Sequence, residues 1–117
     1  MFRMPLLKLE TSVAVPDNKR SALLASLSEI VTEVTGKPEQ YVMVTATQSA
    51  ILMSGTPENT AFVDVRGIGL NADMNKQLAR KISKLLSDTL GIAPNRTYLN
   101  FTDVLAENWG WNGDTFG

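Results

Sequence analysis

Matching helix and turn signals recur in this chain at a spacing of about 55 residues and divide it into two similar halves. In each half an aspartate stands near a helix start, a glycine stands where the helix would end, and a proline then prevents the helix from resuming. The corresponding residues are Asp17 and Asp73, Gly36 and Gly91, and Pro38 and Pro94. We interpret this pattern as an internal duplication of one strand, helix, strand unit.

The first half contains the signals of all three elements. Side chains alternate between apolar and polar over residues 6–11, as in a strand with one buried face. Apolar residues follow at helical spacing over residues 18–35, and Gly36 ends that helix. A second strand is predicted over Tyr41–Thr47, which is rich in residues that suit a pleated surface.

The second half repeats this order. Ala61–Arg66 is predicted to be a strand, and either Asn71 or Asp73 can cap the helix that follows. Gly91 ends the helix, and Thr97–Phe101 is predicted to be the closing strand. The second half is therefore predicted to contain a strand, a helix and a strand in the same order as the first half.

Two right-handed crossover units of this kind predict an α/β fold, with a four-stranded mixed sheet and two helices on one face. The chain of 117 residues has room for a single domain, spanning 1–117. The second face of the sheet has no helix to cover it. We therefore expect copies of the chain to associate through their bare sheets.

Composition excludes several classes of function. The net charge is −1 and no basic run occurs, which argues against nucleic acid or an anionic membrane as the partner. No apolar run is long enough to span a bilayer and no secretory signal is present, so we expect a cytoplasmic protein. The chain has no cysteine and no histidine, so catalysis would depend on amines, carboxylates, hydroxyls or the backbone. We expect no metal and no cofactor.

Pro5 stands directly behind Met4 at the head of the first strand. If synthesis begins at Met4 and that methionine is removed, Pro5 carries a free secondary amine that titrates near neutral pH. If synthesis begins at Met1, the large Phe2 side chain prevents methionine removal, and the Pro5 nitrogen stays an amide without basicity. Residues 1–4 then form an N-terminal extension. Taken alone, Pro5 is better interpreted as a strand-edge proline.

Aromatic side chains gather near the C-terminus at Tyr98, Phe101, Trp109, Trp111 and Phe116. Together with other motifs in the same order, they resemble the macrophage migration inhibitory factor and D-dopachrome tautomerase family, from Met4 to Gly117. The motifs are Met4-Pro5, Thr35–Pro38 with Tyr41, Ile68-Gly69, Asn95–Phe101 and Gly110–Phe116.

The resemblance implies a homotrimeric keto–enol tautomerase that needs no cofactor. Its substrates would be phenylpyruvate-like α-keto acids or dopachrome-like compounds. Pro5 matches the catalytic base and Lys37 the cation that binds the substrate carboxylate or enolate oxygen. Ile68 matches a position whose backbone amide donates to the same carboxylate. Tyr98 and Asn100 match residues that reach the pocket from a neighbouring subunit; packing between subunits is their alternative role.

The remaining pocket residues would be aromatic. Trp111 and Phe116 match the apolar rim and Tyr41 lies at the mouth, although aromatic residues there serve equally as interface anchors. Trp109 stands where the family is expected to have a smaller aliphatic side chain, which narrows the pocket or changes which ring fits. Thr60–Val63 replaces the Cys-x-x-Cys pair of vertebrate members, so thiol exchange is excluded.

Two other roles remain open for a chain of this family. One is a cytokine-like binding trimer with a vestigial or blocked pocket, a protein receptor as partner and secretion without a signal peptide. The other is a structural trimer with no ligand. Only the enzyme requires a free Pro5 amine.

Overall fold

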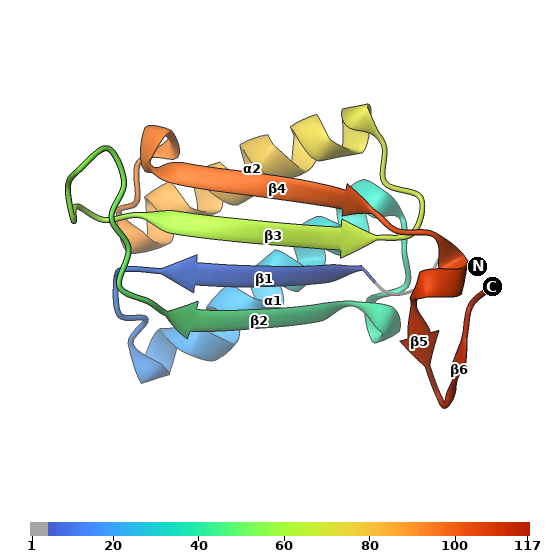
Figure 1. Cartoon of the computed structure of the whole chain (residues 1–117). Coiled ribbons are helices and arrows are strands. Elements are labelled where there is room, and N and C mark those ends of the chain that lie inside the picture. Colours follow the sequence, from blue (N-terminus) through green and yellow to red (C-terminus); the bar gives the residue numbers. More distant parts are fainter. Residues whose placement is uncertain (1–4) are drawn as a thin grey trace.

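The computed structural model describes residues 5–117, in which the two predicted units lie side by side in one sheet (Figure 1). The first unit consists of β1 (Leu6–Thr11), α1 (Asp17–Thr35) and β2 (Met43–Gln48). The second consists of β3 (Ala61–Gly67), α2 (Ala72–Leu90) and β4 (Thr97–Asp103). The N-terminal extension predicted for residues 1–4 lies outside the described residues.

The sheet has the strand order β2-β1-β3-β4 and is mixed, as predicted. Each unit contributes one parallel pair, β1 with β2 and β3 with β4, because a crossover helix joins its strands. The units meet where β1 and β3 pair antiparallel, with Leu6 opposite Arg66 and Thr11 opposite Ala61. This junction brings the start of β1 to the end of β3.

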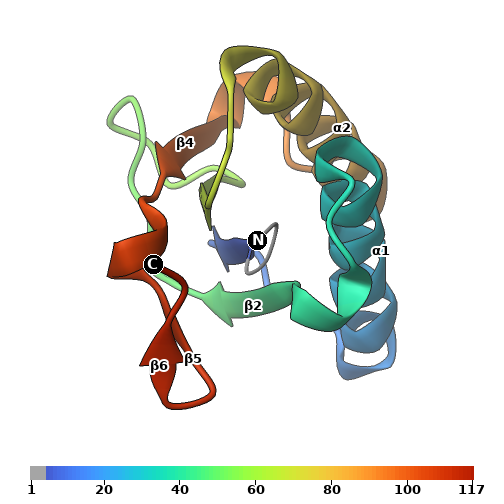
Figure 2. The ribbon, with the colours of Figure 1, turned by 90° about the vertical axis from the view of Figure 1, so that its right-hand side faces the viewer.

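Both helices cover one face of the sheet, and the core lies between the two layers (Figure 2). The predicted apolar stripes supply it, because alternate strand positions and every third or fourth helix position face inward. The buried strand residues include Leu7, Leu9, Val63 and Val65; the buried helix residues include Leu23, Leu27, Val31, Leu78, Ile82 and Leu86. The predicted helix–sheet layers are therefore confirmed.

The helix ends follow the duplicated signals. Gly36 and Gly91 both adopt the left-handed conformation, with φ of 70° and 66°, and end α1 and α2. Of the two caps predicted for α2, Asn71 takes the role, because its side chain accepts a hydrogen bond from the Met74 amide. Asp73 lies in the first helical turn.

A short 3₁₀ turn follows each helix, η1 (Glu39–Tyr41) in the first half and η2 (Pro94–Arg96) in the second. The prediction that Tyr41 begins the second strand is therefore wrong. The Tyr41 amide bonds the Pro38 carbonyl at 3.0 Å, and β2 begins only where the Met43 amide reaches the Pro5 carbonyl at 3.0 Å. Tyr41 is displaced from the sheet to its rim.

The C-terminal segment folds into η3 (Ala106–Asn108) and a hairpin of β5 (Gly110–Trp111) and β6 (Asp114–Thr115), which the sequence reasoning missed. Asn112 and Gly113 make its turn with φ of 54° and 81°. Asn-Gly is the pair that a tight hairpin favours. The hairpin stands at the same end of the sheet as the start of β1 (Figure 1).

The open face of the sheet carries both polar and apolar side chains. Lys8, Asp64 and Asn100 occupy neighbouring cross-strand positions on it, and Arg66 forms an ion pair with Asp64 at 3.1 Å. Met43 and Tyr98 lie on the same face and are 60% and 66% exposed, and association of copies through this face stays a prediction. None of the helices in residues 5–117 is long and apolar enough to cross a membrane.

At the opposite end of the sheet from the hairpin, Arg96 holds the loop between β2 and β3. Its guanidinium donates to the carbonyls of Met53 at 2.7 Å, Thr56 at 3.1 Å and Glu58 at 3.0 Å, and to the Thr60 hydroxyl at 2.6 Å. The planar fork of arginine suits several acceptors at once.

Candidate active site

Pro5 lies buried at the head of β1, at the end of the sheet where the hairpin stands. Because Leu6 pairs with Arg66, the antiparallel register places Pro5 beside Gly67, the last residue of β3. A cavity of about 270 Å³ opens here. Its lining comprises Pro5, Leu6, Gln40, Tyr41, Val42, Met43, Trp109, Gly110 and Trp111.

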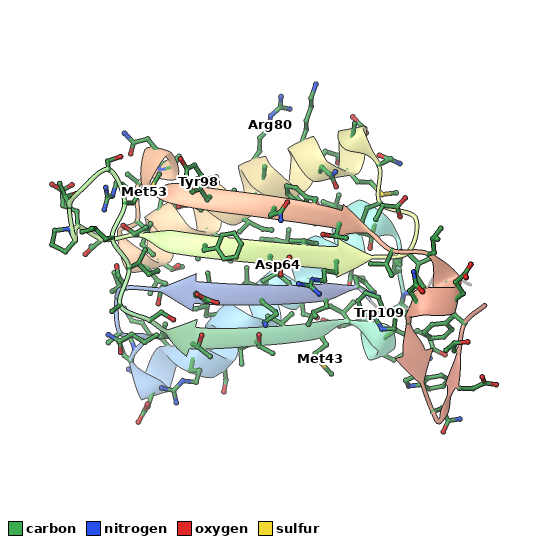
Figure 3. All side chains as sticks on the ribbon, viewed as in Figure 1. Met43, Met53, Asp64, Arg80, Tyr98 and Trp109 are labelled. Atoms are coloured by element: carbon green, nitrogen blue, oxygen red, sulfur yellow. The ribbon has the colours of Figure 1, made fainter. Side chains whose placement is uncertain are left out.

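Aromatic rings form one wall of this cavity. Tyr41 meets Trp111 edge to face with ring centroids 5.6 Å apart, and Phe116 stacks on Trp111 at 6.1 Å. Trp109 lines the cavity from the segment before β5 (Figure 3). The structure thus brings Pro5, Tyr41, Trp109 and Trp111 together around the cavity. Phe116 is not part of the lining and supports the wall by stacking on Trp111.

Lys37 is the buried cation of this region, with only 2% of its surface exposed. The left-handed conformation at Gly36 turns the chain out of α1, and the Lys37 ammonium then donates to the Ile68 carbonyl. Burial lowers the pKa of Lys37, because an apolar environment penalises the charged form, while the Asp103 carboxylate opposes that change. Lys37 and Ile68 are therefore in contact. Ile68 directly follows Gly67, which lies opposite Pro5 in the register of β1 with β3.

Tyr98 and Asn100 do not join this group within one chain. They lie on the open face of β4, where Tyr98 pairs with Phe62 and Asn100 with Asp64. Asp103 is the last residue of β4 and lies at the end of the sheet where Pro5 is found. Tyr98 is five residues earlier, so about 16 Å of extended strand separates Tyr98 from Asp103. Figure 3 shows Tyr98 and Trp109 toward opposite ends of the sheet.

Asp103 belongs to this region and was missed from the sequence. It ends β4 opposite Gly67, and its carboxylate oxygen Oδ1 accepts from the amides of Gly69 at 2.8 Å and Leu70 at 3.2 Å. The available signal was its place at the carboxyl end of a strand parallel to β3.

A somewhat larger hollow, of about 330 Å³, lies between α1 and α2. Apolar side chains such as Leu23 and Leu85 line most of it, and its charged members, Lys19 and Asp88, are exposed on the surface. The cavity at Pro5 is smaller, but it lies close to a buried cation and has an aromatic wall.

The arrangement near Pro5 suits a small anionic molecule with an aromatic ring. Lys37 supplies positive charge in a region that excludes water, where electrostatic attraction is stronger than in bulk solvent. The aromatic wall offers a flat apolar surface for a ring. Within residues 5–117, no three histidine, cysteine, aspartate or glutamate side chains gather in a way that could hold a metal ion.

The sheet order, the one-sided helices and the proline at the head of β1 define an α/β protein of the tautomerase superfamily fold. The sequence model of the macrophage migration inhibitory factor family matches residues 4–117. The chain therefore belongs to the macrophage migration inhibitory factor family.

Individual relatives agree over nearly the whole chain. Macrophage migration inhibitory factor of Rattus norvegicus is 35% identical, covering 97% of this chain and 99% of the relative. The crystal structure of the homologue from Prochlorococcus marinus superposes with a TM-score of 0.90 at 37% identity, covering 96% of this chain and 99% of that one. The corresponding protein of Entamoeba histolytica gives a TM-score of 0.92 at 28% identity, covering 97% and 100%.

Proposed function

We propose that this protein is a cofactor-independent keto–enol tautomerase that acts on phenylpyruvate-like α-keto acids or dopachrome-like compounds. The observation that carries the proposal is the place of Pro5. It is buried in an aromatic-lined cavity, beside the turn whose Ile68 carbonyl receives the Lys37 ammonium. A proline amine at that place is a base held next to a site for an anion.

In the proposed reaction, the Pro5 amine is the general base. It removes a proton from the carbon beside the substrate carbonyl. The electron pair of that C–H bond forms the C=C bond of the enol, the π pair of the carbonyl moves to its oxygen, and that oxygen is then protonated. The reverse sequence returns the proton to carbon. Lys37 and the Ile68 amide would hold the substrate carboxylate, and Lys37 would stabilise the negative charge that develops on oxygen.

Burial and a neighbouring cation both disfavour a protonated amine, so a free Pro5 amine here would be a base near neutral pH. Bases matched to the working pH contribute about 10²–10⁴-fold to rate. This contribution requires that Pro5 is the first residue, because an amide nitrogen has no lone pair to offer.

The decisive experiment compares phenylpyruvate tautomerisation by the 117-residue chain with that by a chain beginning at Pro5. Intact mass establishes each N-terminus. We expect activity only in the form that begins at Pro5, and a loss of at least about 10²-fold in its Pro5→Gly variant. Equal activity in both forms would remove Pro5 from the mechanism.

We further propose that the active assembly is a homotrimer, in which Tyr98 and Asn100 of one subunit complete the pocket of its neighbour. The proposal is supported by their exposure on the open face and by their distance from Pro5 along β4. Sedimentation equilibrium is expected to give the mass of three chains.

Mixing subunits tests the shared pocket directly. Lys37→Ala and Asn100→Ala are each expected to lose most activity alone. Refolded together, they would regain activity, because some interfaces then combine an intact Lys37 with an intact Asn100. A mixture no more active than its parts would show that each pocket uses one chain only.

A second candidate function is a binding trimer whose pocket is blocked, with a protein receptor as its partner. Its supporting observation is that four residues precede Pro5 in the sequence, which makes its nitrogen an amide. Inactivity of both N-terminal forms, with both folded, would favour this function over the enzyme.

A further inference from the structure

The turn that follows β3 is held by one carboxylate from the end of β4. Asp103 Oδ1 accepts from the Gly69 amide at 2.8 Å and from the Leu70 amide at 3.2 Å. The Val104 amide also donates to the Gly67 carbonyl at 2.8 Å, which extends the β3–β4 pairing to the base of the turn. The turn over residues 67–70 is thereby fixed at both ends.

The same turn positions the Lys37 ammonium. Its Ile68 carbonyl accepts from Lys37 Nζ, and a Cβ added at Gly69 would lie 3.8 Å from that nitrogen. Gly69 has φ of 87°, a conformation that side chains with a Cβ rarely adopt. The shape of the turn and the position of the cation are therefore coupled.

We propose that Asp103 is a positioning residue of the active site: through the Gly69 and Leu70 amides it fixes the turn that holds Lys37, and it supplies the negative charge facing that cation. The inference deepens the proposed function, on which its kinetic part rests. Asp103 itself touches no substrate, and it acts through Ile68 and Lys37.

The charge of Asp103 and the burial of Lys37 change the pKa of Lys37 in opposite directions. Burial lowers the pKa of Lys37, and the Asp103 carboxylate raises it. The Ile68 carbonyl, which is uncharged, accepts a hydrogen bond from the same ammonium. Loss of the carboxylate charge would therefore lower the pH above which Lys37 becomes neutral and no longer attracts an anion.

Two substitutions separate the two roles. Asp103→Asn keeps an oxygen that accepts from both amides but removes the charge, whereas Asp103→Ala removes both. Asp88→Asn is the control, because it changes net charge equally and instead loses the ion pair with Lys84 on α2. The direct readout is an NMR titration of the Lys37 side chain in the full chain, assigned with Lys37→Arg.

We expect the pKa of Lys37 to fall in Asp103→Asn and to stay unchanged in Asp88→Asn. With phenylpyruvate, Asp103→Asn should move the alkaline limb of kcat/KM to lower pH. A rate loss of about 2- to 5-fold at neutral pH is expected, because the Asp103 carboxylate is exposed and solvent weakens its attraction to the cation. Asp103→Ala should show the same shift, a lower unfolding temperature and a larger loss of kcat/KM.

An unchanged Lys37 titration in Asp103→Asn would overturn the charge role. An Asp103→Ala protein with wild-type stability and wild-type pH profile would overturn the positioning role. If no form of the protein turns over phenylpyruvate, the proposed function fails, but the NMR titration and the unfolding temperature still decide the inference about Asp103.

Discussion

The ammonium of Lys37 donates to the carbonyl oxygen of Ile68, although the two residues are 31 positions apart in the chain. Within residues 5–117, Lys37 is the one charged side chain that is buried. A buried cation lowers stability unless its hydrogen bonds are made, and the Ile68 carbonyl supplies one of these bonds.

Replacement of Lys37 by methionine should change how stability depends on pH. Because burial lowers the pKa of Lys37 in the folded state, the unfolded chain binds more protons between that lowered value and about 10.4. The free energy of unfolding of the wild type should therefore rise, relative to Lys37→Met, from about pH 7 to about pH 10. Urea denaturation at both pH values measures this difference.

The matched control is Lys84→Met, because the Lys84 side chain is 77% exposed in its ion pair with Asp88. It should show little pH dependence relative to the wild type. If the difference in free energy of unfolding between the wild type and Lys37→Met does not change with pH, folding does not lower the pKa of Lys37.

Trp109 should determine which rings enter the cavity. Trp109→Val removes an indole from the lining of a cavity of about 270 Å³. We expect kcat/KM for a bicyclic substrate, indolepyruvate, to rise relative to phenylpyruvate by roughly tenfold, because pocket size discriminates by such factors. Leu105→Ala is the control, since Leu105 is 64% exposed and outside the cavity lining. An unchanged substrate ratio would exclude Trp109 from specificity.

Arg96 should stabilise the loop between β2 and β3. Arg96→Ala leaves the carbonyls of Met53, Thr56 and Glu58 without this donor, and we expect a loss of about 2–3 kcal/mol in the free energy of unfolding. Amide exchange over residues 53–60 should accelerate. Arg80→Ala, on the outer face of α2 (Figure 3), should change stability by less than about 0.5 kcal/mol. Equal effects of the two variants would refute the role of Arg96.

The Asn71 cap should contribute measurably to α2. Asn71→Ala removes the acceptor of the Met74 amide, which is 2.9 Å away, and should cost about 1 kcal/mol. Asn71→Ser keeps a capping oxygen and should retain most of the stability. Thermal unfolding of the two variants tests this, and an Asn71→Ser protein as unstable as Asn71→Ala would point to a cause other than capping.

The layers of the fold were predictable because local signals agree with one another in both halves. Alternation in β1, the apolar stripes of α1 and α2, and the glycines at 36 and 91 each indicate the same elements. Tyr41 was misassigned because its β propensity is opposed by a turn that Pro38 begins. The β5–β6 hairpin was missed although its Asn112-Gly113 pair is a hairpin signal.

The site was only partly predictable for a different reason. The places of Pro5, Tyr41, Trp109 and Trp111 followed from a motif order, and the structure gathers them around one cavity. Asp103 carries no motif, because its hydrogen bonds to Gly69 and Leu70 depend on the register of β3 with β4, which is a tertiary property. The roles assigned to Tyr98 and Asn100 stay predictions, since one chain alone does not bring them to Pro5.

The cavity joins residues from the two ends of the described chain, Pro5 at the head of β1 and Trp109 with Trp111 beside the hairpin (Figure 1). During translation, the helix–sheet layers can therefore begin to pack while no pocket exists. In a nascent chain the cavity would stay incomplete until Trp111 has emerged from the ribosome. An affinity tag attached after Gly117 would begin beside the hairpin and this cavity (Figure 1), so a tag on an internal surface loop is the safer choice for assays.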